Sequence, residues 1–303
     1  MTTDSNPASS PTLSDWVAGA RPRTLPAAVV PVVVGAACAA GAGDSFGDGV
    51  MWWRVGLALA VSLLLQIGVN YANDYSDGVK GTDDVRVGPM RLVATGTASA
   101  GAVKRAAFGI LFLAAIAGLV LAVATTWWLI AVGALAILAA WGYTGGPKPY
   151  GYLGLGELFV FVFFGLVATV GTTYVAIEEV PGITWLAATG VGLGACALLV
   201  INNLRDIPTD REVGKRTLAV RLGDRRTRVL YTGLLVGAIV AAAACAFERR
   251  WSLLAILAAV VAIEPIRKVL RGATGRDLIP VLGATGKTQL LYGLLFSVGL
   301  ALG

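Results

Sequence analysis

The sequence contains no histidine among its 303 residues, which removes the commonest general base and the commonest ligand for transition metals. Any chemistry in this chain must therefore rest on carboxylates, cations and tyrosines. Charged residues make up only 14% of the chain, whereas hydrophobic residues make up 56%, and the mean hydropathy is +0.76. This composition excludes an ordinary water-soluble domain and indicates a polytopic helical membrane protein.

Cysteine is also scarce. The three cysteines, Cys38, Cys196 and Cys245, are far apart, and each lies inside an apolar run. Neither a disulfide framework nor a thiolate metal site is indicated, so we expect them to be packing residues. The formal net charge of +6 does not predict a nucleic-acid partner, because the uneven distribution of cations between the loops explains it.

Nine apolar runs have about the length that a bilayer-spanning helix requires. The last is short and rich in glycine, and the third and fourth nearly meet at Thr125, so the pattern predicts eight or nine transmembrane helices. A Ser-, Thr- and Pro-rich tail, residues 1–13, is predicted to be disordered, and residues 14–303 to form a single transmembrane domain. The runs cover residues 26–42, 51–73, 105–123, 126–143, 157–177, 184–204, 229–246, 251–268 and 287–302.

The loops on one side of this predicted bundle hold nearly all the cations. Of the 24 Lys and Arg residues, only Arg54, Arg249 and Arg250 fall on the opposite side. The positive-inside rule places the cation-rich loops and the N-terminus in the cytoplasm. We therefore expect a multi-pass protein of the cell (inner) membrane whose charged end faces the cytoplasm.

Two of the predicted spans end, on that side, in a group of carboxylates. Asn73 and Asp77 follow the second span, and Asn202 and Asp206 follow the sixth. In each pair the residues are four apart, so on a helix both side chains project from one face. Carboxylates at the end of a membrane helix are costly to desolvate, and we expect them to line a wet cavity and to bind a cation. Oxygen ligands on two facing elements suit Mg²⁺.

The repeated position of these groups predicts an internal duplication. Each group closes the second helix of a four-helix set, and each is followed by a long basic loop. The repeat halves are about 14–150 and 151–280. A parallel repeat of this kind would place the two groups opposite each other across a central cavity.

Cations follow both carboxylate groups. Carboxylates beside cations suit a metal diphosphate, because the carboxylates hold the metal while Arg and Lys bind the remaining phosphate oxygens and the charge that develops as diphosphate leaves. Each single cation also fits ordinary topology anchoring. The candidate substrate-binding residues are Arg21, Asn73, Lys80, Arg86, Arg91, Asn202, Arg205, Lys215 and Arg216.

Three further segments have local signals. A short interfacial helix carrying Trp16, capped by Ser14, is predicted before the first span. The Gly- and Pro-rich loop 141–152 indicates a shaped lid whose one cation is Lys148, with Tyr152 interpreted as an interfacial belt residue. The segment 283–288 resembles a phosphate-binding loop but lacks the first glycine and a preceding strand, so we expect an ordinary loop before the last helix.

Together, Asn73-Asp74-x-x-Asp77 and Asn202-x-x-Arg205-Asp206-x-x-x-Asp210 resemble the paired motifs of the UbiA superfamily of intramembrane prenyltransferases, over nearly the whole chain. Many members have a further acid at the position of Gly81. Here the next acids are Asp83 and Asp84, so either or neither completes the metal site. This longer form of the motif, Asn73-Asp74-Tyr75-x-Asp77-x-x-x-Gly81-x-Asp83, resembles the branch that prenylates 1,4-dihydroxy-2-naphthoate in menaquinone synthesis. Three more segments resemble the same branch: Arg21-Pro22-x-Thr24-Leu25-Pro26, Tyr143-Thr144-Gly145-Gly146-Pro147 and Gly214-Lys215-Arg216-Thr217.

The resemblance implies an all-α bundle with a central cavity, whose cytoplasmic cap binds a polyprenyl diphosphate through Mg²⁺. The isoprenoid tail would then lie in an apolar groove with candidate lining residues Phe159, Phe163 and Phe164. The implied metal ligands are Asp74, Asp77, Asp83, Asp206 and Asp210. The implied catalytic residues are Asp77, Asp206 and Asp210, with Lys148, Tyr143 or an aspartate helping to ionise a hydroxyl of the acceptor.

The absence of histidine fits a reaction in which the prenyl group joins the ring carbon that bears the acceptor's carboxylate. Loss of CO₂ then restores aromaticity, and no ring proton needs a base. Two alternatives remain: the same chemistry on 4-hydroxybenzoate, homogentisate, a porphyrin or a sugar phosphate, or a cation-coupled transporter. Carboxylates at helix ends, and the dense cations that follow them, count against transport. Prenyl chain length, acceptor contacts and oligomeric state are not specified by these patterns.

Overall fold

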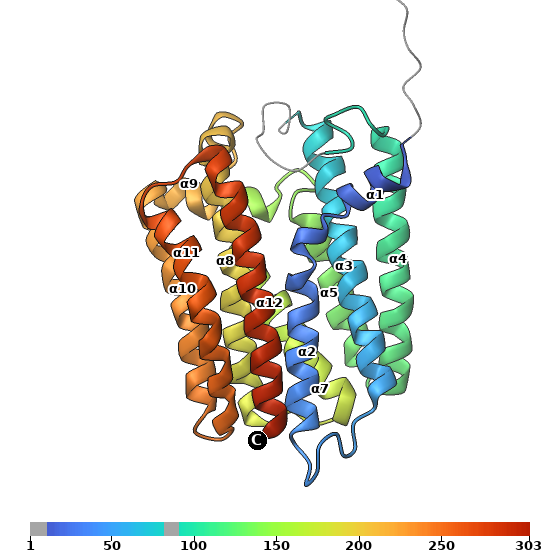
Figure 1. The fold of residues 1–303 in the computed structure, drawn as a ribbon. Coiled ribbons are helices and arrows are strands. Elements are labelled where there is room, and N and C mark those ends of the chain that lie inside the picture. The colour runs from blue at the N-terminus through green and yellow to red at the C-terminus, as the bar shows by residue number, and fades with distance from the viewer. Residues whose placement is uncertain (1–10, 82–90) are drawn as a thin grey trace, which may run out of the picture.

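The computed structural model of the chain describes residues 11–81 and 91–303, and over these ranges the protein is a bundle of helices without strands (Figure 1). Every predicted apolar run falls on helix. The elements are α1 (Leu13–Gly19), η1 (Pro22–Thr24), α2 (Pro26–Ala40), α3 (Trp52–Val79), α4 (Ala100–Ala124), α5 (Trp128–Gly142), η2 (Tyr150–Leu153), α6 (Gly156–Val160), η3 (Phe161–Val167), α7 (Ala168–Ile177), α8 (Gly182–Glu212), α9 (Leu218–Leu222), α10 (Asp224–Cys245), η4 (Arg250–Leu257), α11 (Ala258–Leu270), η5 (Gly275–Asp277) and α12 (Leu278–Leu302).

Five helical segments of the described ranges are long and apolar enough to cross a membrane. They are α3, α4, the continuous segment Gly156–Ile177, α8 and α10. The bent pair Leu13–Thr24 and Pro26–Ala40 makes a sixth if it is counted as one span. The protein is thus a multi-pass membrane protein, and the predicted eight or nine crossings are compatible with this set.

Helix α8 lies at the centre of the bundle. In its most apolar stretch 72% of the residues are buried, compared with 28% in α3 and 39% in α10. It packs against α10, α12, α2 and η3. Helices α2 and α12, from opposite ends of the chain, run side by side at the front of Figure 1. Helices α2 and α12 thus both pack on α8 and on each other.

The N-terminal segment bends sharply over the bundle. Helix α1 is capped by Thr12, whose side chain accepts from the Asp15 amide, so the predicted cap at Ser14 is wrong by two residues. Residues 1–10 of the predicted tail lie outside the described residues. A bend of 54° separates Leu13–Thr24 from α2. Within Leu13–Thr24, just before η1, Arg21 adopts a left-handed backbone (φ 54°), a strained conformation for a residue other than glycine.

A π-helical segment, η3, interrupts the span between α6 and α7. Within η3 the backbone approaches α8 closely, because a Cβ added to Gly165 would lie only 2.6 Å from the Cα of Gly192 on α8. π-bulges of this kind are frequent at functional sites, because they re-aim the side chains around them. Here the segment carries Phe161, Phe163 and Phe164.

Both motif-bearing helices extend beyond their predicted ends. Helix α3 continues to Val79 and α8 to Glu212, so both carboxylate groups lie on helix and not after it. The expected pairing of side chains four apart on one helical face is therefore realised. The segment 283–288, predicted as a loop, also lies inside a helix, α12, because Pro280 is placed in the first turn, where a missing amide hydrogen costs nothing.

Candidate active site

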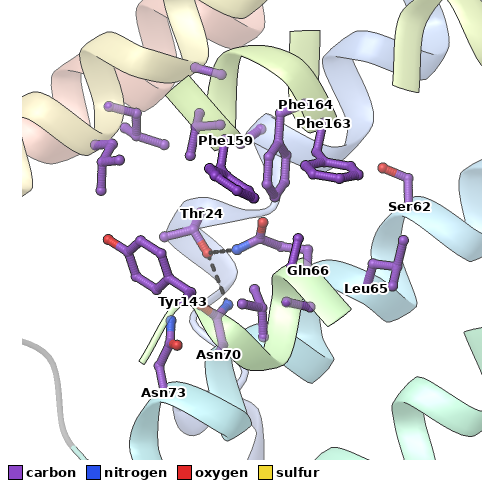
Figure 2. A pocket seen from close by; sticks show the side chains of 18 of the residues that line it. Thr24, Ser62, Leu65, Gln66, Asn70, Asn73, Tyr143, Phe159, Phe163 and Phe164 are labelled. Carbon is purple, nitrogen blue, oxygen red and sulfur yellow. Dashed lines mark hydrogen bonds between the residues drawn. The ribbon is translucent and has the colours of Figure 1, made fainter. Parts of the chain in front are cut away.

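A cavity of about 610 Å³ opens in the bundle beside the C-terminal ends of α3 and α8. Carboxylate and amide side chains line it at this end. These are Asn73, Asp77, Asn202, Asn203, Asp206 and Asp210. Deeper in the bundle the lining is largely apolar and includes Phe159, Phe163 and Phe164, the candidates for a tail groove (Figure 2). The cavity therefore joins a polar end to an apolar interior.

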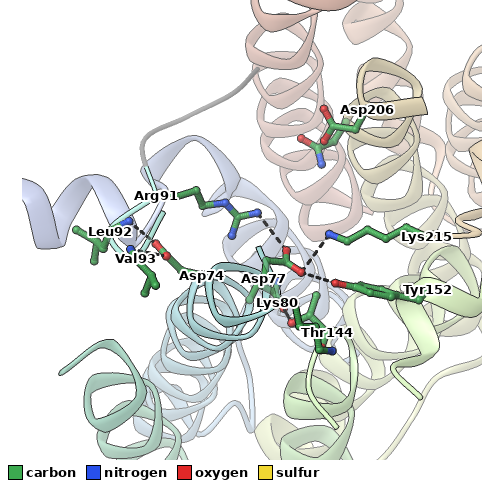
Figure 3. A network of polar contacts seen from close by, with 12 residues as sticks. Asp74, Asp77, Lys80, Arg91, Leu92, Val93, Thr144, Tyr152, Asp206 and Lys215 are labelled. Atoms are coloured by element: carbon green, nitrogen blue, oxygen red, sulfur yellow. Dashed lines mark hydrogen bonds and ion pairs between the residues drawn. The ribbon is translucent and has the colours of Figure 1, made fainter. Parts of the chain in front are cut away.

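Asp77 is the most connected carboxylate of the cavity. It is 3% exposed. Its Oδ1 accepts from the Tyr152 hydroxyl at 2.8 Å and from Lys215 Nζ at 3.1 Å, and its Oδ2 lies 3.5 Å from Arg91 Nη2 (Figure 3). Tyr152 and Lys215 are distant in sequence, so this carboxylate ties α3 to the second half of the chain. The interpretation of Tyr152 as a belt residue is wrong, because its hydroxyl is bonded inside the site.

The second carboxylate group is compensated locally. Arg205 holds Asp206 with two bonds, Nε to Oδ1 at 2.6 Å and Nη2 to Oδ2 at 2.8 Å. The same Nη2 also donates to Asn202 Oδ1 at 2.9 Å. One turn further on, the Asp210 carbonyl accepts from the Lys215 amide at 2.8 Å, which positions the following loop. Asn202, Asp206 and Asp210 thus form one polar face of α8, as their spacing predicts.

Asp74, predicted as a metal ligand, has a different setting. It is 1% exposed, and its two oxygens accept the backbone amides of Leu92 at 2.8 Å and of Val93 at 3.0 Å. It is not among the residues that line the cavity. The structure places Asp74 where it fixes the chain next to Arg91, and Arg91 reaches Asp77. We therefore assign Asp74 a positioning role.

The predicted substrate-binding residues divide into two sets. Arg21, Arg91, Arg205 and Lys215 line the cavity together with Asn73 and Asn202. Lys80 and Arg216 are exposed and outside its lining, as is the predicted catalytic Lys148. Lys80 instead donates to the Thr144 carbonyl at 2.7 Å and to the Gly146 carbonyl at 3.3 Å, so it holds the 141–152 loop. Asp83, Asp84 and Arg86 lie outside the described residues.

Tyr143 lines the cavity next to Tyr150 and Phe159. Burial, followed by the nearby carboxyl of Glu157, raises the pKa of Tyr143, and burial also raises the pKa of Tyr150. Both side chains therefore remain phenols at neutral pH and are suited to donate a hydrogen bond, not to remove a proton. The Tyr150 ring stacks on Phe159 with centroids 3.8 Å apart, which continues the aromatic wall.

Glu157 is a buried acid beside the cavity that the sequence pattern did not reveal. It is 9% exposed, and its Oε1 accepts from Asn203 Nδ2 at 3.0 Å. Within the described part of the chain its Oε2 is buried without a hydrogen-bond partner. The only sequence signal was an acid at the start of the fifth apolar run, where a carboxylate is usually an exposed helix-start residue. Its bond orients the Asn203 amide at the cavity wall.

The donor set of the cavity fits a hard divalent cation. Asp77, Asp206 and Asp210 supply carboxylate oxygens, and asparagine amides supply more, with no nitrogen or sulfur ligand among them. In residues 11–81 and 91–303 no three or more acids, cysteines or histidines gather closely enough to hold a metal by themselves. Mg²⁺ is usually bound through one or two carboxylates together with substrate phosphates, and the carboxylates of this cavity suffice for that.

Comparison with known proteins gives concordant results. Residues 28–279 match the UbiA prenyltransferase family. The 1,4-dihydroxy-2-naphthoate octaprenyltransferase of Mycobacterium tuberculosis is 51% identical over 290 residues, which cover 96% of this chain and 98% of that protein. The enzyme of the same name from Escherichia coli is 38% identical over 95% of each chain.

Solved structures share the fold. A UbiA homolog from Archaeoglobus fulgidus bound to DMAPP and Mg²⁺ superposes with a TM-score of 0.60 at 17% identity, over 93% of this chain and 99% of that one. The apo structure of a UbiA homolog from Aeropyrum pernix gives 0.65, also at 17% identity, over 90% and 97%. At such identity the likeness establishes the architecture only.

Proposed function

This chain belongs to the UbiA prenyltransferase family, and we propose that it transfers a polyprenyl group from polyprenyl diphosphate to 1,4-dihydroxy-2-naphthoate, with loss of CO₂ and diphosphate, in menaquinone biosynthesis. The observation that carries the proposal is the single cavity in which Asp77 and Asp206, with cations beside each, border an apolar interior. Relatives of that name at 51% and 38% identity support this acceptor.

The residues that would hold Mg²⁺ are Asp77, Asp206 and Asp210, because they are the carboxylates that line the cavity. When bound, the metal would supply positive charge for the diphosphate oxygens and so stabilise the leaving group. Asn73, Asn202 and Asn203 add amide dipoles at the same end. Asp77 is already paired with Lys215 and Arg91, so the cations and the carboxylate are pre-assembled for a ligand that carries both metal and phosphate.

The cations of the cavity bind the diphosphate directly in this proposal. Lys215 and Arg91 lie on the Asp77 side, and Arg205 lies on the Asp206 side. Charge-assisted hydrogen bonds from these groups strengthen as negative charge gathers on the departing oxygen. The apolar interior excludes water, which would otherwise capture the allylic cation and give the prenol.

The acceptor step requires no strong base from the protein. The bond forms between the allylic carbon and the ring carbon that bears the carboxylate. The bond from that carbon to CO₂ then breaks, and its electron pair restores the aromatic ring. Tyr143, with its raised pKa, donates a hydrogen bond in this scheme. Lys148, exposed and outside the cavity lining, is not assigned the catalytic role predicted for it from the sequence.

The test is an assay of the detergent-purified protein with a prenyl diphosphate and a panel of acceptors. We expect equimolar CO₂, pyrophosphate and prenylated naphthoquinol from 1,4-dihydroxy-2-naphthoate, with EDTA silencing the reaction and Mg²⁺ restoring it. Retention of a carboxyl label in the product would exclude decarboxylative transfer. Preference for 4-hydroxybenzoate would assign the protein to another branch of the family.

We also propose that the carboxylate end of the cavity faces the cytoplasm, because Arg54, Arg249 and Arg250 are the only cations of the sequence at the opposite end. The test uses the substitutions Lys148→Cys and Asp48→Cys, each made separately. Both positions are exposed, and they lie at opposite ends of the bundle. An impermeant thiol reagent should label the cysteine at Asp48 in intact cells and spare the one at Lys148. The reverse pattern would contradict this orientation.

A further inference from the structure

Helix α3 carries polar side chains far inside the bundle, beyond the carboxylate group. Gln66 and Asn70 are 6% and 3% exposed, and both line the cavity. Asn70 is seven residues from Asp77, which is about 10 Å along the helix axis. Buried polar side chains in a membrane span are costly unless a structural or functional partner compensates them. The partners of these two amides are therefore informative.

Thr24 fixes the orientation of both amides. Its hydroxyl donates to the Arg21 carbonyl at 2.9 Å, which uses its only hydrogen. Gln66 and Asn70 each lie 3.1 Å from the same hydroxyl oxygen, so both must present their NH₂ groups to it. Asn70 also donates to the Ala20 carbonyl at 2.9 Å, which can only accept. The hydrogen-bond network, and not an arbitrary choice of amide flip, thus determines which amide atoms remain available to a ligand.

The amide oxygens of Gln66 and Asn70 remain available. Within the described residues no group donates a hydrogen bond to Gln66 Oε1 or to Asn70 Oδ1. Both residues belong to the cavity lining, and the aromatic side chains of Phe159, Phe163 and Phe164 face them (Figure 2). The cavity therefore presents two fixed hydrogen-bond acceptors, one helical turn apart, beside an aromatic wall. This arrangement is complementary to a flat ring that carries hydroxyl donors.

We propose that Gln66 and Asn70 are the residues that recognise the aromatic acceptor, by accepting hydrogen bonds from its ring hydroxyls. The ring packs on the phenylalanines, which in this proposal contact the acceptor in place of the isoprenoid tail. The inference rests on the proposed function and extends it to acceptor specificity. The acceptor is then held deeper in the bundle than the diphosphate, with the reacting allylic carbon between them. An acceptor with two hydroxyls engages both oxygens, whereas a monohydroxy acceptor engages one, which favours dihydroxynaphthoate over 4-hydroxybenzoate.

Thr24 is a positioning residue in this proposal. It holds both amides, and it lies at the end of the segment Leu13–Thr24, which is bent by 54° relative to α2. The alternative is that the two amides have a purely structural role and only attach this segment to α3. The two readings differ in one observable: only recognition makes the KM for the acceptor sensitive to the amide oxygens while the KM for the prenyl diphosphate stays unchanged.

The experiment compares Gln66→Leu and Asn70→Leu with Gln289→Leu. Gln289 on α12 is a matched control, because it is also a buried amide (2% exposed) in a membrane helix but does not line the cavity. We expect each α3 variant to raise the KM for the dihydroxynaphthoate acceptor about ten-fold or more, the scale of one lost hydrogen bond to a buried site, and to leave the KM for the prenyl diphosphate within about two-fold.

A second measurement changes the acceptor and begins with the parent protein. The two monomethyl ethers of the acceptor each remove one hydroxyl donor, and we expect each to be a poorer substrate of the parent protein. In a variant that has lost the matching oxygen, the penalty for that ether should disappear. Equal turnover of the ethers and the diol by the parent overturns the proposal.

The proposed function and this inference fail in different ways. Absence of parent turnover with dihydroxynaphthoate overturns the proposed function, and the inference with it. Parent turnover combined with α3 variants that behave like Gln289→Leu overturns the inference alone. A parallel rise in both KM values also overturns it, because it indicates a disturbed cavity and not lost acceptor recognition.

Discussion

The two carboxylate groups share a sequence pattern but are neutralised in different ways. Asp77 on α3 is met by Lys215, Arg91 and Tyr152, of which Lys215 lies 138 positions away in sequence. Asp206 on α8 is held by its neighbour Arg205 through two bonds. Among the contacts between described residues, Asp77 is paired with cations from other segments of the chain, whereas Asp206 is paired with the adjacent residue on its own helix.

Because their partners differ, the two similar motifs contribute differently to the stability of the fold. A locally paired Asp206–Arg205 unit keeps its geometry as long as α8 is helical. Asp77 reaches Lys215 and Tyr152 only when the two halves of the chain are packed together, so it also joins the halves at the mouth of the cavity. Substitution of Asp77 should therefore loosen the contact between the two halves of the chain, whereas substitution of Asp206 should destabilise α8 locally by removing the partner of the buried Arg205.

The largest effect is expected from removing either carboxylate. Asp77→Ala and Asp206→Ala should each lower turnover by roughly two to four orders of magnitude, the scale of lost electrostatic stabilisation at a site of charge development. Pyrophosphate release at saturating substrate and ordinary Mg²⁺ measures it. Glu264→Gln, an exposed acid paired with Lys268 on α11, is the control and should retain full turnover. Near-normal turnover of the Asp206→Ala variant would show that Asp206 is not a metal ligand.

A smaller effect is expected from breaking the pair that joins the halves. Lys215→Met leaves the buried Asp77 without one of its countercharges, and the loss of one partner of a buried pair destabilises by about 3–5 kcal/mol. Turnover should fall about ten- to a hundred-fold, together with the thermal midpoint. Adding Asp77→Asn should cost less stability than the sum of the single changes, as for residues in contact. Strict additivity would show that the two residues are not coupled.

Much of the fold follows from the sequence because hydrophobic length and loop charge are local signals. All nine predicted runs fall on helix, and the spacing of Asn202, Asp206 and Asp210 places them on one face, as expected. The duplication of about 14–150 and 151–280 stays a prediction. Helix ends were less accurate, because a polar terminal turn such as 74–79 looks like a loop when only hydropathy is read.

The partners of individual side chains could not be predicted in the same way. Tyr152 and Lys80 both lie near the first motif in space, but nothing in their local sequence states that one would donate to Asp77 and the other to the Thr144 carbonyl. Glu157 needed the packing of α6 on α8 to reach Asn203. Such contacts join segments that are tens of residues apart, and the pattern of one segment does not encode the register of another.

An intermediate test of the α3 side concerns a single hydrogen bond. Tyr152→Phe removes the hydroxyl that donates to Asp77 and keeps the ring over which Lys215 Nζ lies, 4.8 Å from the centroid. A hydrogen bond to a charged group contributes about 1.5–3 kcal/mol to stability, so turnover should fall roughly ten-fold and the thermal midpoint should fall with it. Tyr231→Phe, which removes a buried hydroxyl bonded to Thr285 away from the cavity, is the matched control. Equal losses in both variants would show that the Asp77 bond has no special role.

The smallest effect on turnover is expected at Asp74, although it stands next to Asn73 in the motif and was predicted as a metal ligand. Its oxygens hold the Leu92 and Val93 amides, so Asp74→Asn removes the charge but keeps one acceptor oxygen for this pair. Turnover should fall less than ten-fold, while weakened charge-assisted bonds lower the free energy of unfolding by about 1–3 kcal/mol. Because these bonds position the neighbouring Arg91, any kinetic change should appear in the KM for the prenyl diphosphate before it appears in turnover. The opposite result would be a hundred-fold loss of turnover with unchanged thermal stability and a raised Mg²⁺ requirement. It would show that Asp74 binds the metal, and that the first motif provides two carboxylate ligands, Asp74 and Asp77.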